Sequence, residues 1–196
     1  MNPKKPTLYK FSEILNDLMD YFILGDAEYL LQYRLKNSLP EDLLTEFTTL
    51  DTGDVAIEQG VFVPMCGVNP DPHTIYFNLS DETPELLKPQ NQLQHRKDGY
   101  CLRVENGKIC LYTMPYLREY TEKTVENLKK NRTAAIKIPN GWYSVAILAG
   151  LTSQTSEWEN KKYETLEPTF EFLIKRSSDK PRYSGDFLHR FEIIKK

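Results

Sequence analysis

Cysteine and histidine are scarce in this 196-residue sequence, which contains three of each. No CxxC, HxH or HExxH spacing occurs among them, so the sequence predicts no zinc site and no cofactor. An odd number of cysteines without paired spacing is typical of reduced thiols rather than of a disulfide framework. We therefore predict that Cys66, Cys101 and Cys110 are free.

Motifs for phosphate binding and for serine hydrolysis are also missing. The nine glycines never fall in GxGxxG, GxxxxGK or GxSxG patterns, so neither nucleotide binding nor an α/β-hydrolase nucleophile is supported. The 25 basic and 28 acidic residues give a net charge of −3. Because proteins that bind nucleic acid generally carry a basic excess, the charge makes nucleic acid an unfavoured partner.

No hydrophobic run is long enough to cross a membrane, since the longest, residues 145–151, has only the length of a strand. Lys4 and Lys5 are not followed by an apolar signal-peptide core. We predict a cytoplasmic protein without membrane association. The length is that of a single domain, residues 1–196, with a helical segment at 1–50 packed on a β-rich body at 55–196.

Apolar spacing predicts that the first quarter of the chain is helical. Apolar residues between positions 11 and 23 recur at intervals of three and four, as on one face of a helix. Asp26 can cap a second helix over residues 27–36, and the capping-box pattern at 38–41 predicts the start of a third. Residues 51–54 have the composition of a turn that leads into the sheet.

The strongest β signal is Asn106-Gly107, which lies between two alternating runs and predicts a two-residue hairpin turn. This turn would pair residues 100–105 with residues 108–113 and place one set of apolar side chains on the core. That set is Tyr100, Leu102, Val104, Ile109 and Leu111.

An amphipathic helix is predicted over residues 117–131. Residues 142–151 are almost entirely apolar and predict the central strand of the sheet. Residues 152–168 are predicted as a polar loop, and further strands are expected at 170–174 and 187–194. The predicted fold class is α+β, with N-terminal helices followed by a mostly antiparallel β-sheet and one further amphipathic helix.

Aromatic residues in polar surroundings are the main indication of function. Large amphipathic side chains of this kind often anchor protein interfaces. The candidates for partner binding are Trp158, Glu157, Glu159 and Tyr163 in the predicted loop and Tyr112, Tyr116 and Tyr120 where the predicted hairpin leads into the next helix. Together with the negative net charge, they predict a non-enzymatic protein that binds another protein. An inhibitor or immunity protein that recognises a basic toxin or effector is one concrete case.

A second hypothesis is a hydrolase or transferase whose site lies near the helix-to-sheet junction. Its candidate polar residues are Asp51, Asp54, Cys66, Asp71 and His73. Leu50-Asp51-Thr52-Gly53 resembles the motif of aspartic proteases, which would need a second aspartate from another copy of the chain. A turn explains the same residues without catalysis.

Overall fold

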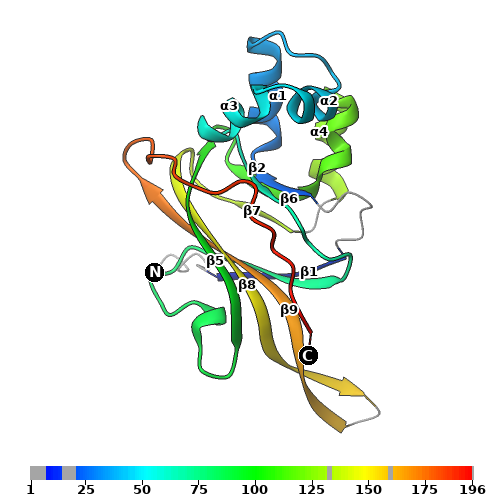
Figure 1. The fold of residues 1–196 in the computed structure, drawn as a ribbon, viewed down its shortest axis with the longest axis vertical. Helices are drawn as coiled ribbons and strands as arrows, with labels where there is room; N and C mark the ends of the chain where they lie inside the picture. Colours follow the sequence, from blue (N-terminus) through cyan, green and yellow to red (C-terminus); the bar gives the residue numbers. More distant parts are fainter. Residues whose placement is uncertain (1–7, 15–20, 132–133, 159–160, 196) are drawn as a thin grey trace, which may run out of the picture.

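The computed structural model describes residues 8–14, 21–131, 134–158 and 161–195, which form two β-sheets and a layer of helices (Figure 1). The larger sheet has the strand order β1-β4-β9-β8-β5. Its strands are β1 (Leu8–Ile14), β4 (Pro72–Asn78), β9 (Lys161–Ser177), β8 (Gly141–Trp158) and β5 (Gln92–Val104). The β4–β9 pair is parallel and the other pairs are antiparallel.

The smaller sheet is antiparallel and has the strand order β3-β2-β6-β7. Its strands are β3 (Phe62–Met65), β2 (Phe22–Gly25), β6 (Lys108–Thr113) and β7 (Ala135–Lys137). The helices gather at one end of the molecule, beyond this sheet (Figure 1). They are α1 (Ala27–Lys36), α2 (Leu43–Thr49), α3 (Thr52–Glu58) and α4 (Glu122–Asn131), with the 3-10 helix η2 (Met114–Glu119) beside them. A further 3-10 helix, η1 (Glu85–Leu87), packs near the larger sheet.

Two apolar cores separate the three layers. The inter-sheet core lies between the two sheets and contains Phe22, Leu24, Val63, Met65, Ile109 and Leu111 from the smaller sheet and Ile75, Phe77, Val104, Ile147, Phe170 and Phe172 from the larger. The helix-side core lies on the other face of the smaller sheet. It contains Ile23, Phe62, Cys110 and Tyr112 from that sheet and Leu30, Leu43, Ile57, Leu117, Val125 and Leu128 from the helical layer.

The predicted order of helices followed by a sheet is wrong. The first described element is a strand, and the helices fall in two groups, α1–α3 between β2 and β3 and α4 between β6 and β7. The helix predicted over residues 11–23 is replaced by β1 and β2, which belong to different sheets. Phe22 and Leu24 point into the inter-sheet core and Ile23 into the helix-side core. A strand that is buried on both faces is apolar at successive positions. Such a run also fits the intervals of three and four that identify a helical face.

The predicted hairpin at Asn106-Gly107 is also wrong, although its apolar face was assigned correctly. β5 belongs to the larger sheet and β6 to the smaller, so the chain crosses between sheets at this point. Gly107 has φ +69°, but Asn106 does not have the positive φ that a type I′ turn requires. The backbone N–H groups of Glu105 and Asn106 instead donate to the carboxylate of Asp26, at 2.9 and 2.7 Å.

Several predicted elements in the second half of the chain need correction. The central strand is β9 rather than β8, although β8 has a neighbour on each side. Residues 152–158 and 161–168 do not form a loop, because there β8 and β9 continue as a paired ribbon that projects from the body (Figure 1). The strand predicted at 187–194 is instead a turn at residues 187–188 followed by an irregular segment with one isolated bridge, between Arg190 and Cys66.

Other predictions are confirmed in whole or in part. α1 begins after Asp26, whose carboxylate accepts from the amides of Glu28 and Tyr29 at 3.1 Å. α4 occupies most of the predicted helix over residues 117–131. The three cysteines are free and buried. The third helix is capped by Asp42 rather than at Ser38, and the turn predicted at 51–54 is the start of α3.

Candidate functional site: a groove beside the helix-side core

An open groove of about 550 Å³ lies where the helical layer meets the smaller sheet. Its floor comes from β2 and β3, one wall from the junction of α2 and α3, and another from Phe187 and Leu188 of the segment 186–195, which we call the strap. Its apolar lining includes Phe47, Leu50, Ile57, Phe62, Pro64 and Met114. Pockets that bind ligands commonly have this volume and this kind of lining.

A close approach of two helices shapes the first wall. Gly53 lies in the first turn of α3, and a Cβ atom at this position would be 2.6 Å from the carbonyl oxygen of Phe47. The missing side chain therefore lets α3 pack directly on the end of α2. Phe47 stacks on Phe62 of β3, with ring centroids 5.7 Å apart, which closes the inner end of the groove.

The rim of the groove exposes large apolar side chains. Leu50 is 56% exposed and Leu188 is 69% exposed, although both line the same hollow. Single exposed leucines are ordinary on protein surfaces, whereas apolar residues grouped around a hollow are typical of a binding site.

Two carboxylates give this rim a negative charge. Asp51 and Asp54 line the groove beside Leu50, and neither has an ion-pair partner within the described part of the chain. An apolar floor with unpaired carboxylates at its edge can hold an apolar side chain and attract a neighbouring cation. Nothing in this arrangement supplies a nucleophile with an adjacent base.

Two of the three tyrosines of the predicted cluster lie in the helix-side core, and the third is half-buried beside it. Tyr112 and Tyr120 are buried, and their hydroxyl oxygens are 3.4 Å apart. The hydroxyl of Tyr120 also donates to the carbonyl of Ala27 at 3.0 Å. Burial raises the pKa of both phenols, so both stay neutral. Tyr116 is half-buried, with its ring edge-on to Tyr112 at 6.4 Å.

The other predicted site residues lie on or near the β8–β9 ribbon. Tyr163 is 46% exposed on β9. Glu157 and Trp158 form the end of β8, where they pair with Lys162 and Lys161. Their side chains, and the whole of Glu159, lie outside the part that the structure describes.

The residues of the second hypothesis do not share one environment. Asp51 and Asp54 line the groove, whereas Cys66 and His73 are both buried. The thiol of Cys66 donates to the carbonyls of Leu188 and His189, at 3.4 and 3.1 Å, which requires the protonated, unreactive form.

The ring of His73 is turned to a backbone carbonyl, with Nδ1 2.7 Å from the oxygen of Asp71. Asp71 itself pairs with Lys195 at 3.4 Å. Across the described residues, no group of three or more His, Cys, Asp or Glu side chains could hold a metal ion.

The groove was missed at the sequence level because its walls come from segments more than 100 residues apart. Leu50 was assigned to the end of the helical segment, Asp51 and Asp54 to a turn and Leu188 to a strand, and none of these assignments suggested an exposed apolar wall. The one available signal was the placement of Leu50 directly before Asp51 and Asp54.

Comparisons with known proteins leave the family open. No family model matches the chain, and no curated protein matches its sequence. A solved structure described as crocagin biosynthetic gene J is similar at 12% identity with a TM-score of 0.41, over 85% of this chain and 95% of that chain. Within the described residues, no helix has both the length and the apolar character needed to span a membrane.

Proposed function

We propose that this protein binds another protein, and that the groove receives a short apolar segment of the partner carrying a basic residue. The observation that carries the proposal is the exposure of Leu50 and Leu188, from two distant segments of the chain, in the lining of a hollow of about 550 Å³ with an acidic rim. The groove replaces the tyrosine cluster as the expected contact surface.

The chemistry of the partner follows from the groove. Burying one leucine or phenylalanine side chain contributes about 1.5–3 kcal/mol, so two apolar anchors would supply a large share of the binding free energy. Lysine or arginine next to the anchors would pair with Asp51 or Asp54 and accelerate association. A basic toxin or effector remains a concrete case of such a partner.

The test uses a defined probe, a display library of random peptides panned on the whole protein. We expect enrichment of peptides that combine leucine or aromatic anchors with lysine or arginine. Leu188→Glu should weaken binding of a selected peptide by about tenfold or more, because it places a charge on the apolar wall. Asp54→Lys should slow association and remove the preference for basic residues.

Leu166→Glu is the matched control, because Leu166 is 41% exposed on β9 and does not line the groove. It should leave the affinity unchanged. Selected peptides that bind Leu188→Glu and the unmodified protein equally would place the binding surface elsewhere.

A further inference from the structure

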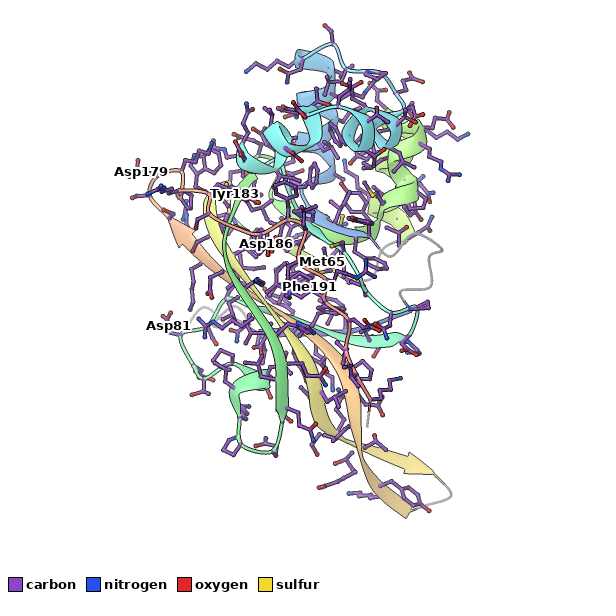
Figure 2. The ribbon with its side chains drawn as sticks, viewed as in Figure 1. Met65, Asp81, Asp179, Tyr183, Asp186 and Phe191 are labelled. Carbon is purple, nitrogen blue, oxygen red and sulfur yellow. The ribbon has the colours of Figure 1, made fainter. Side chains whose placement is uncertain are left out.

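The strap, residues 186–195, joins β5 to the segment after β3 and also forms one wall of the groove. Its amide at Phe191 donates to the carbonyl of Cys66 at 2.8 Å, and Tyr100 of β5 donates through its hydroxyl to the carbonyl of Asp186 at 2.8 Å. Phe191 and Ile193 are buried in the inter-sheet core. Figure 2 shows the strap running from Asp186 to Phe191, past Met65 of the same core.

The two halves of the strap are therefore held differently. Phe191 and Ile193 are fixed by apolar packing. Phe187 and Leu188 face the groove, and Leu188 is largely exposed. Phe187 is partly buried against the helix-side core. The first half of the strap is also held by polar contacts, and one of them is a pair of imidazoles.

His189 of the strap lies against His95 of β5, with Nε2 of His189 3.2 Å from Nδ1 of His95. On its other side, Nε2 of His95 is 2.8 Å from the carbonyl oxygen of Glu192. Because a carbonyl only accepts, Nε2 of His95 carries a hydrogen. In neutral His95, Nδ1 is then an acceptor, and Nε2 of His189 is the donor to it.

This contact tolerates one added proton but not two. A single proton taken up by the pair leaves one nitrogen as donor and the other as acceptor. A second proton turns both facing nitrogens into donors, and two cations then lie side by side. The rings are only 5.2 Å apart, so the bond is replaced by repulsion.

The groups around the pair include one cation, Lys97, and one anion, Asp186, which act on His189 in opposite directions. Burial and the positive charges of Lys97 and His95 lower the pKa of His189, against the opposing effect of Asp186. Lys97 comes from β5 and pairs with Asp186 of the strap at 3.4 Å. Phe191 packs edge-on against His189 at 4.7 Å, and Cys66 contacts the strap through the carbonyl of His189.

We propose that the His95–His189 pair is an acid-sensitive clasp that holds the groove wall formed by Phe187 and Leu188 in its binding position. Double protonation of the pair releases the first half of the strap, while Phe191 and Ile193 stay in the core. The expected loss of binding in acid rests on the proposed function of the groove. The opening of the clasp in acid does not depend on that function.

The test is hydrogen exchange of the strap amides in the whole protein at about pH 7.5 and about pH 5, corrected for intrinsic exchange rates. The amides of Leu188 and His189 bond to the side chain and the carbonyl of Asp186, so they report on the first half of the strap. Their exchange should accelerate about tenfold or more in acid, while amides of β8 and β9 keep their protection.

His189→Gln is the matched variant, because glutamine keeps a donor for Nδ1 of His95 and does not titrate. Its strap should show less than about a twofold acceleration. Equal acceleration in both proteins, no acceleration in the unmodified protein, or an equal loss of protection in β8 and β9 would each overturn the clasp.

Peptide binding separates the clasp from the function of the groove. A display-selected peptide should lose affinity in acid for the unmodified protein and keep it for His189→Gln. If no groove-specific peptide is selected at either pH, the proposed function fails while exchange still decides the clasp. If peptides bind and strap exchange does not respond to pH, the clasp alone is wrong.

Discussion

The smaller sheet faces a different kind of core on each side. The inter-sheet core is packed between two sheets and includes Phe191 and Ile193 of the strap, and its tyrosines Tyr100 and Tyr143 donate to backbone carbonyls. The helix-side core is covered by short helices, contains Tyr112 and Tyr120 with their hydroxyls facing each other, and opens into the groove. A sheet face covered by another sheet is sealed along its length, whereas short helices leave gaps at their junctions. The candidate binding site lies at such a gap.

The largest effect is expected from a charge placed in the sealed core. Val104→Asp should lower the free energy of unfolding by about 4 kcal/mol or more, because Val104 is fully buried among apolar groups. Chemical denaturation measures the loss. Glu105→Ala, one residue along, should cost less than about 1 kcal/mol through its ion pair with Arg103. Similar small losses for both would mean that the inter-sheet core is not sealed.

The next largest effect concerns Asp26, which ties the helical layer to the loop between β5 and β6. Asp26→Ala removes the cap of α1 and leaves the partly buried amides of Glu105 and Asn106 without their acceptor, which should cost about 2–4 kcal/mol. Thermal unfolding would show the loss. Asp42→Ala removes an exposed cap of α2 and should lower the Tm much less. Equal decreases in Tm for the two variants would mean that Asp26 stabilises the protein only by capping α1, and that its bonds to Glu105 and Asn106 add nothing.

His73 should make stability depend on pH. Burial lowers its pKa in the folded protein, so the unfolded chain binds a proton that the folded chain does not. Stability is complete above the ordinary histidine pKa of about 6.5 and falls as the pH decreases below it, by at most about 1.4 kcal/mol per pH unit.

His73→Phe should flatten this slope between about pH 6.5 and 5, as measured by denaturation at each pH. The ring packs on Phe170 at 5.1 Å, and its Nε2 has no hydrogen-bond partner among the described residues, so phenylalanine suits the site. His189→Gln serves as the comparison, since the pKa of His189 is also lowered. An unchanged slope in His73→Phe would show that other groups cause the acid sensitivity.

The smallest effect tests the polar contact inside the helix-side core. Tyr120→Phe removes the donor to the carbonyl of Ala27 and should cost about 1 kcal/mol in chemical denaturation. Tyr163→Phe changes an exposed ring on β9 and should leave stability unchanged. If both variants are as stable as the unmodified protein, the tyrosine pair adds packing but no net hydrogen-bond energy.

Local signals in the sequence predicted local features well. The cap at Asp26, the body of α4 and the apolar face that contains Val104 and Ile109 are all present. The sequence did not predict that the two strands beside Asn106-Gly107 join different sheets instead of pairing with each other. The carboxylate of Asp26, some 80 residues away, binds the loop that a hairpin turn would otherwise occupy. Phe22, Ile23 and Leu24 were misread because burial on two faces removes the alternation that identifies a strand.

The candidate site was harder to predict than the fold. Tyr112 and Tyr120 were expected to contact a partner because they lie where a predicted strand leads into a predicted helix, but the helical layer covers them. The groove depends on how α2, α3 and the strap meet in space, and no single stretch of sequence contains that information.

The Asp26 carboxylate also constrains the order in which the chain folds. It joins groups 79 and 80 residues apart. Closing such long loops costs conformational entropy that later contacts must offset, and chains rich in distant contacts fold slowly. We therefore expect the bonds from Asp26 to Glu105 and Asn106 to form later than the local bonds with which Asp26 caps α1.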